Sequence, residues 1–385
     1  MIGVRSQGLE LAKTLSGFAD VEIGAVCDVD SSVLQTAREK IAGLQSARPA
    51  AHEDFRRLLD DRSLDAVVIA TPDHWHAPMA VLACAAGKDV YVETPVSHGI
   101  AEGPAMSDAA KRYGRIVQSG LTHRSGEHFQ AAVALVKAGE IGNVKLARAW
   151  AVHRRKPIGR KPDAPAPEKV DYDRWLGPAA ERAFQPNRFH HNWQWFWDYG
   201  SGELGAWGVQ LLDIARWGLG VGLPVRVAAT GGIHYLNDDR QTPDTLTVQY
   251  SYPRASIVWE HRQWSNHGIE GRSAAVAFYG DNGTLIVGRG GWKIYGRRNS
   301  LSGEASDSQT PHLRNFIDCI KSRGAPAADI EVGQLSSTLC HLGNLSYRLG
   351  REVMFDPATM GFGWDGEANS LAAVEYREPW TLPMA

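Results

Sequence analysis

The chain has 385 residues, of which 43% are hydrophobic and 22% are charged, a composition typical of a globular protein with room for two domains. The formal net charge of −2 gives no basic surface field, so the composition argues against nucleic acid or a membrane as a partner. The four cysteines are widely spaced and lack a CxxC motif, which predicts buried thiols and neither a disulfide nor a metal site.

The first 122 residues alternate short apolar runs with amphipathic segments. Strands are predicted over 21–27, 66–70, 90–92 and 116–117, and helices over 9–18, 31–42 and 76–86. The strand segments are rich in β-branched residues without polar alternation, which indicates parallel strands covered on both faces. Repeated strand–helix units predict an α/β domain over 1–122 built on a doubly wound parallel sheet.

Almost no strand precedes the glycine-containing turn that opens the chain, although a doubly wound sheet needs a central first strand. We therefore expect a start that is clipped ahead of Met1. The chain as it stands carries no export signal, which favours a cytoplasmic protein, whereas a signal lost with the clipped part would indicate the periplasm.

Residues 3–8 carry a weakened form of the glycine pattern with which doubly wound domains bind dinucleotides. The middle glycine of GxGxxG allows close approach to a pyrophosphate, and here that place holds Arg5. Asp28 lies 20 residues beyond Gly8, where a carboxylate would accept hydrogen bonds from the ribose and favour NAD over NADP. Taken alone, Asp28 would be read as a residue that ends a strand. The cofactor contacts expected here are Gly3, Ser6, Gln7, Gly8 and Asp28.

Two further loops follow strand ends that face the same way, TPDHWH at 71–76 and ETP at 93–95. Ligands of open α/β sheets bind outside the carboxyl ends of the strands. The cofactor contacts expected from these loops are Thr71, Pro72, His74, His76, Glu93 and Pro95.

The predicted strands in the second half of the chain are mostly longer than those in the first. Strands are predicted over 144–153, 225–235, 245–252, 255–264, 273–279 and 284–287, with a hairpin turn at 281–283 and helices over 203–219, 312–322 and 335–349. We expect an α+β domain over 123–355 with a large, open, mostly antiparallel sheet. The tail, 356–385, is expected to pack back on the rest.

The chain resembles the Gfo/Idh/MocA family, which includes glucose-fructose oxidoreductase and inositol dehydrogenase. The resemblance is carried by ATPDHWH at 70–76, GKDVYVE at 87–93, residues 205–213, and the FYG and GTL segments at 278–280 and 283–285. It implies a Rossmann domain that binds NAD, a carbohydrate substrate, and a homo-oligomer formed through the second-domain sheet.

Three positions depart from the pattern of that family. Its Glu-Lys-Pro motif appears here with Thr94 in place of lysine, and its helix Asp and His are Ala206 and Gln210. The resemblance implies catalytic positions at Thr94 and Gln210, yet neither side chain titrates, and a positioned base is worth about 3 to 5 kcal/mol. His123 and His191 are candidates for a substitute base, although a structural role is more common for a single histidine.

The aromatic segment 189–199 has two readings, because tryptophans stack on sugar rings but also fill interdomain cores. The expected substrate contacts are Arg124, Asn192, Trp193, Trp195, Asp198 and Asp213. Three functions stay open: an NAD-dependent oxidoreductase acting on a sugar, polyol or glycoside; a glycoside hydrolase or lyase that uses tightly bound NAD by transient oxidation; and a catalytically degenerate protein that binds dinucleotide or sugar.

Overall fold

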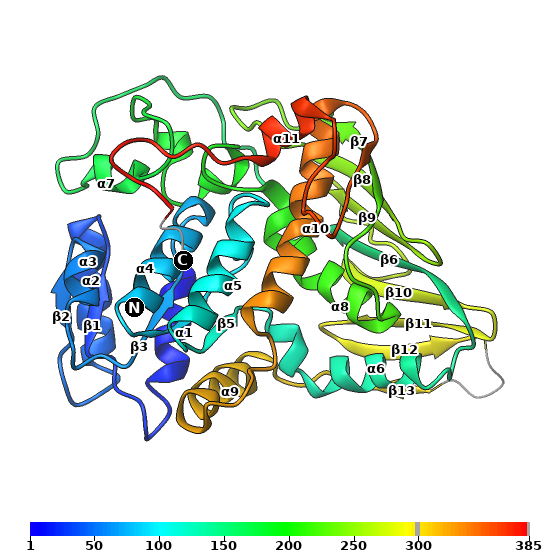
Figure 1. Ribbon diagram of the computed structural model, residues 1–385, viewed down its shortest axis with the longest axis horizontal. Helices are drawn as coiled ribbons and strands as arrows, with labels where there is room; N and C mark the ends of the chain where they lie inside the picture. The colour runs from blue at the N-terminus through cyan, green and yellow to red at the C-terminus, as the bar shows by residue number, and fades with distance from the viewer. Residues whose placement is uncertain (297–300, 383–385) are drawn as a thin grey trace.

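A computed structural model describes residues 1–296 and 301–382 of the chain. Its N-terminal domain is a parallel sheet with helices on both faces, on the left of Figure 1. Its elements, in chain order, are α1 (Ser6–Leu15), β1 (Ala25–Cys27), α2 (Ser31–Ala42), β2 (Ala50–His52), α3 (Phe55–Leu59), β3 (Ala66–Ile69), α4 (His76–Ala85), β4 (Asp89–Val92), α5 (Glu102–Arg112) and β5 (Val117–Ser119).

Ile2 occupies the centre of this sheet. It forms parallel bridges to Cys27 of β1 and Ile69 of β3, and so joins the β1–β2 pair to the β3–β4–β5 ribbon. The Met1 ammonium donates to the Ala25 carbonyl at 2.9 Å, and burial lowers its pKa to about 6. A single residue therefore takes the position of the central first strand.

The C-terminal domain is built on one nine-stranded sheet, on the right of Figure 1. Its strand order is β13-β12-β11-β10-β6-β9-β8-β7-β14, and every pairing is antiparallel except β6 with β9. The strands are β6 (Val144–Val152), β7 (Arg226–Gly232), β8 (Thr245–Ser251), β9 (Ser256–Arg262), β10 (Ala274–Gly280), β11 (Gly283–Gly288), β12 (Gly291–Tyr295), β13 (Ser302–Gly303) and β14 (Val353–Met354). The fold class predicted from the sequence is confirmed.

Six further α-helices follow among the described residues, of which α6, α8 and α10 contact the large sheet. They are α6 (Glu127–Lys137), α7 (Tyr172–Leu176), α8 (Val209–Leu219), α9 (Gln309–Ser322), α10 (Ile330–Leu349) and α11 (Gly366–Ala372). The long α10 runs between the domains in Figure 1 and contacts both α5 and β7. Leu313 and Phe316 of α9 belong to the same core cluster as Met1 and Val4, so the chain returns to complete the first domain.

Two long irregular segments, 169–195 and the tail after α11, cover the strand ends of the first domain and are together called the roof. Residues 169–195 dock on its strand ends, where Ser31 N donates to Lys169 O and Asp171 N donates to Val29 O. The tail after α11 crosses over the same region, drawn in red in Figure 1, before it turns down toward the first domain. Trp380 of this tail packs against the rings of Phe55 and Trp75.

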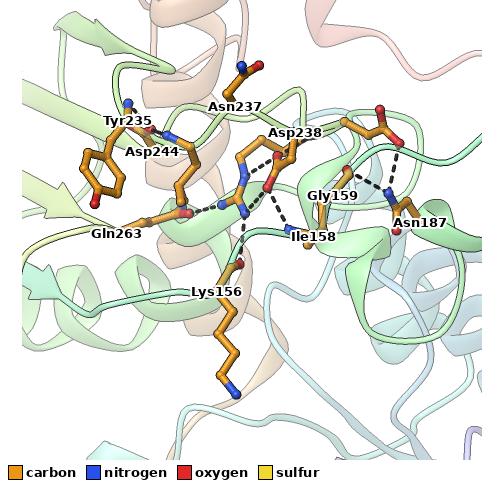
Figure 2. Close-up of polar contacts among 12 residues, drawn as sticks. Lys156, Ile158, Gly159, Asn187, Tyr235, Asn237, Asp238, Asp244 and Gln263 are labelled. Carbon is orange, nitrogen blue, oxygen red and sulfur yellow. Dashed lines mark hydrogen bonds and ion pairs between the residues drawn. The ribbon is translucent and has the colours of Figure 1, made fainter.

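A buried polar network fixes the roof to the second domain (Figure 2). Asp238 accepts from Ile158 N at 2.8 Å and pairs with Arg240 Nε at 2.8 Å, with both side chains fully buried. Arg240 also donates to Lys156 O, and Asn187 Nδ2 donates to Gly159 O at 2.9 Å. Because buried charges are costly unless paired, this network holds the 156–159 loop in one position.

The predicted cysteine state is also confirmed, since all four thiols are buried and free. Among the described residues, no helix is long and apolar enough to cross a membrane.

Candidate functional site

A cavity of about 120 Å³ lies at the carboxyl ends of β1 and β3, as the sheet topology predicts. Four of the predicted cofactor contacts line it: Gly3, Asp28, Thr71 and Pro72. The opposite wall comes from the second domain and the tail, through Trp175, Trp193 and Trp380. The cavity is therefore enclosed by segments that lie far apart in the sequence.

The turn before α1 explains which glycines are required. Gly3 has φ of +78°, and a Cβ on Gly8 would lie 1.9 Å from the Gly3 carbonyl oxygen, so both positions exclude larger residues. Arg5 has an extended backbone that any residue can adopt. Its Nη1 is buried beside the cavity without a hydrogen-bond partner among the described residues. A guanidinium with a buried, unpaired N–H group at the start of a helix fits a phosphate group.

Asp28 ends β1 with its carboxylate at the cavity. The two oxygens accept from Val4 N and Asp30 N, each at 3.1 Å, while burial raises the pKa of the carboxyl group. These backbone bonds orient the side chain and leave lone pairs for a further donor such as a ribose hydroxyl. The residue fits the role that its sequence position predicts.

Thr94 and Gln210 meet at the next strand end, although 116 residues separate them. Gln210 Nε2 donates to Thr94 Oγ1 at 3.2 Å and to Gly120 O at 2.8 Å, and Gln210 Oε1 is buried without a partner among the described residues. The Thr94 hydroxyl can still donate a hydrogen bond, and Gln210 Oε1 can still accept a hydrogen bond. The pair can orient a substrate hydroxyl but cannot take its proton.

Glu93 lies directly behind this pair. It accepts from Gln7 Nε2 at 2.9 Å, and burial raises the pKa of its carboxyl group. A Cβ on Gly120 would lie 2.7 Å from Glu93 Oε2, so the glycine makes room for the carboxylate. His76 lies with its ring nitrogens 2.7 Å from Pro95 O and 2.9 Å from Thr71 O. It thereby ties the two predicted loops together.

A histidine–carboxylate pair that sequence reasoning missed joins the end of β6 to the helical segment that carries Gln210. His153, just past the end of β6, is 3.2 Å from Glu203 through Nδ1, and Arg155 holds the same carboxylate at 2.9 Å. Burial would raise the pKa of Glu203, but His153 and Arg155 outweigh it and lower that pKa. The anionic Glu203 therefore fixes His153 with its proton on Nδ1 and leaves Nε2 as a base.

The helical segment that carries Glu203 begins with a π-helix, η5 (Leu204–Gly208), which continues directly into α8. Glu203 immediately precedes η5, Trp207 lies within it, and Gln210 is the second residue of α8. Trp207 packs on His153 with ring centroids 4.3 Å apart, and Ala206 is exposed. π-helical turns are frequent at functional sites, and no periodicity signal in the sequence distinguishes them from α-helix.

The two histidines predicted as substitute bases have different surroundings, and His123 lies beside the Gln210 backbone. His123 is buried and stacked on Phe129 at 4.2 Å, and burial, with the nearby charge of Arg289, lowers its pKa to about 3. Such an imidazole is a poor base at neutral pH. His191 is exposed, and its pKa is lowered by partial burial and by the nearby charge of Arg5.

Asp213 and Arg124 form a buried ion pair. Arg124 donates to the two carboxylate oxygens at 2.7 and 3.0 Å, and Ser336 Oγ and Arg216 Nη2 donate to Asp213 Oδ1 at 2.7 and 3.2 Å. The Asp213 side chain is 1% exposed. The pair anchors α8 against η2 (Thr122–Ser125) and α10, so both predicted substrate contacts have a structural explanation.

The aromatic segment is not extended, because residues 192–195 form the short helix η4 (Asn192–Trp195). The three tryptophans therefore separate. Trp193 lines the cavity, Trp195 is buried between Arg155 and Arg240, and Trp197 faces a second cavity with Asp198. Asn192 lies partly exposed at the start of η4, and Asp198 pairs with Arg182.

Comparison with known proteins finds a family model for each of two parts of the chain. Residues 1–121 match the Gfo/Idh/MocA model described as the oxidoreductase family, NAD-binding Rossmann fold, and residues 158–382 match that for its C-terminal alpha/beta domain. Two similar curated proteins are a glycosyl hydrolase family 109 protein of Shewanella sp. (strain MR-4) and an alpha-N-acetylgalactosaminidase of Shewanella oneidensis, each 28% identical over 156 residues, or 40% of this chain. The match spans about a third, 34%, of the length of these relatives.

Solved structures share the fold. One is an oxidoreductase from Agrobacterium radiobacter in complex with NAD+, L-tartaric acid and magnesium, with a TM-score of 0.71 and 17% identity over 92% of this chain and 96% of that one. Another is the WlbA dehydrogenase from Bordetella pertussis in complex with NADH and UDP-GlcNAcA, with a TM-score of 0.70 and 17% identity over 92% and 97% of the two chains.

Proposed function

Because the chain belongs to the Gfo/Idh/MocA oxidoreductase family, we propose that it is an NAD-dependent oxidoreductase acting on a hydroxyl of a sugar, polyol or glycoside. The observation that carries the proposal is the arrangement at the strand ends. A roofed cavity lined by Asp28 and Arg5 lies on the same sheet edge as Thr94, and Gln210 reaches that edge from α8.

The residues present fit the dinucleotide. Asp28 would accept hydrogen bonds from the adenosine ribose, Arg5 would neutralise a phosphate, and Trp380 would cover the adenosine end. The carboxylate of Asp28 disfavours a 2′-phosphate, which supports NAD over NADP. The nicotinamide ring supplies hydride acceptance. The protein has to hold the substrate and handle the proton of its hydroxyl group.

We assign the proton handling to His153 and Glu203. Thr94 and Gln210 would orient the hydroxyl, and His153 Nε2 would receive its proton while Glu203 stabilises the imidazolium that forms. Imidazole exchanges protons near neutral pH, so the pair restores a function that lysine and histidine provide in the family pattern.

A second candidate is glycoside cleavage or elimination with retained NAD, in which oxidation of the substrate is transient and reversed before release. Two observations favour it: the curated relatives described as glycosyl hydrolases, and the enclosure of the cavity by Trp193 and Trp380. An enclosed cofactor exchanges slowly, which suits a cycle that regenerates it. This reading needs the same proton-handling pair.

The test compares the purified chain with His153→Gln and Glu203→Gln variants on a panel of polyols, free sugars and nitrophenyl glycosides. Reduced-nicotinamide absorbance reports dehydrogenation, and nitrophenol release reports cleavage. We expect each variant to lose about 10² to 10⁴-fold in turnover while NAD affinity, measured by calorimetry, stays unchanged. Turnover that survives in both variants would refute the assignment of the base. NAD and sugar binding without turnover would favour the degenerate binding protein.

A further inference from the structure

A second cavity, of about 460 Å³, lies on the far side of the 71–76 loop. It is formed by the loop before α5, the last turns of α10, the end of the aromatic segment and the tail at 370–376. None of its lining residues lines the first cavity. Its volume falls within the range of about 300–1,000 Å³ that is usual for small-molecule sites. We refer to it below as the histidine cavity, because His74, His98 and His341 line it.

The three imidazoles are held in one tautomer. Nε2 of His74, His98 and His341 faces a carbonyl oxygen, of Trp175 at 3.1 Å, Trp197 at 2.8 Å and Ser97 at 3.0 Å respectively. A carbonyl oxygen only accepts, so Nε2 carries the proton in each ring and Nδ1 is left with a lone pair. His74 Nδ1 is buried and has no hydrogen-bond partner among the described residues.

The rings also stay neutral. Burial lowers the pKa of His74 and of His341 to about 3, and that of His98 to about 4. The charge of a protonated His98 would further lower the pKa of the other two, so the three rings lie near one another. Across the physiological pH range this wall offers hydrogen-bond acceptors that carry no charge.

Other side chains that line the histidine cavity add further hydrogen-bond acceptors, charges and an aromatic ring. Asn344 Nδ2 donates to Ser201 O at 2.8 Å, which uses one of its two amide protons and orients the side chain, whose Oδ1 is an acceptor. Asp198 adds a carboxylate, balanced by its ion pair with Arg182. Trp197 adds an aromatic surface, and the guanidinium of Arg348 lies 5.3 Å from its ring centroid. The cavity thus combines clustered acceptors with one aromatic face and balanced charge.

We propose that the histidine cavity is a second binding site for a neutral polyhydroxylated molecule, a sugar or a polyol, separate from the proposed cofactor and reaction site. Hydroxyl groups supply the donors that the imidazole, amide and carboxylate acceptors lack, and the C–H face of a sugar ring packs on indole. The lone pairs and the carboxylates of Asp198 and Glu375 disfavour an anion, and the guanidinium of Arg348 disfavours a cation. The proposal does not depend on the proposed redox activity.

The cavity is also connected to the reaction edge through the backbone. His98 follows Thr94 by four residues, and Ser201 precedes Glu203 by two. Ser201 Oγ donates to Asp73 at 2.7 Å, and Val96 N donates to Ser337 Oγ at 3.0 Å, so both connecting segments are held by buried hydrogen bonds. An occupant of the second site is therefore placed to influence Thr94 and Glu203 without touching them.

The test is calorimetric titration of the full chain with myo-inositol and with D-galactose, with acetate and ethanolamine as charged comparison probes. We expect saturable binding of at least one neutral probe and none of the charged ones. His98→Phe keeps the ring shape and removes the acceptor, so it should weaken binding roughly two- to tenfold. His98→Gln restores an acceptor and should recover part of the loss. His234→Phe changes an exposed histidine outside the cavity and should have no effect.

A second variant tests the same binding independently of His98→Phe, so the test does not depend on that variant folding. Trp197→Leu removes the aromatic face at a half-buried position and should weaken the same binding. Thr94→Val, at the reaction edge, should leave it unchanged, which separates this proposal from the proposed function. Absence of saturable binding by either neutral probe overturns the proposal. So does tighter binding of acetate or ethanolamine, or loss of sugar binding in Thr94→Val with retention in both His98→Phe and Trp197→Leu.

Discussion

Replacement of Asp213 by asparagine tests whether this carboxylate is a structural anchor or a substrate contact. The side chain accepts hydrogen bonds from Arg124, Arg216 and Ser336 and is 1% exposed. Removal of one partner from a buried ion pair typically costs about 3–5 kcal/mol, because the remaining charge stays buried and uncompensated. For a domain of this size the melting temperature should fall by roughly 6–20 °C.

The assay is differential scanning calorimetry of the wild type and Asp213→Asn at neutral pH. Asp163→Asn is the matched control, because its pair with Arg188 is 56% exposed on the aspartate side and should contribute less than about 1 kcal/mol. A melting temperature that is unchanged in Asp213→Asn, together with weaker sugar binding, would refute the structural role and restore the substrate contact that the sequence predicts.

The same pair should give the protein an acid-sensitive component of stability. Burial alone would raise the pKa of Asp213, but Arg124 and its other partners outweigh burial and lower it. A carboxyl group whose pKa is lower in the folded than in the unfolded protein stabilises the fold at pH values above its unfolded pKa of about 3.9. That stabilisation is lost as the pH falls through the pKa of the group in the folded protein. The stability difference between wild type and Asp213→Asn should therefore be constant from pH 7 to pH 5 and shrink below about pH 4.

Three further substitutions test the proposed site. Trp380→Ala should open the cavity and accelerate NAD release, measured by stopped-flow fluorescence, and an unchanged rate would contradict the roof. Arg5→Gln should weaken NAD binding and flatten its dependence on salt in titration calorimetry, and equal salt slopes would count against a phosphate contact. Thr94→Lys should raise dehydrogenase turnover by placing a cation beside Gln210, and a variant without any gain would support the degenerate binding protein.

The first domain was predictable from the sequence because its signals are local. Runs such as 66–70 and 90–92 carry the apolar pattern of buried parallel strands, and the order of strands and helices places their ends on one edge. Asp28 and the loop at 71–76 were assigned to the cofactor from their positions after strands, and Asp28, Thr71 and Pro72 line the cavity. The tight contact between Gly3 and Gly8 likewise follows from local chain geometry.

The proton-handling pair and the roof were decided by tertiary structure alone. Fifty residues separate His153 from Glu203, and neither lies in a motif, so only the packing of the helical segment against β6 brings them together. Trp380 reaches the cavity from the far end of the chain. The sequence predicts His123 as a base, but burial in the folded protein lowers its pKa to about 3. Sequence periodicity determines which residues face a core, but the charge, solvation and partners of a side chain depend on segments that sequence order does not relate.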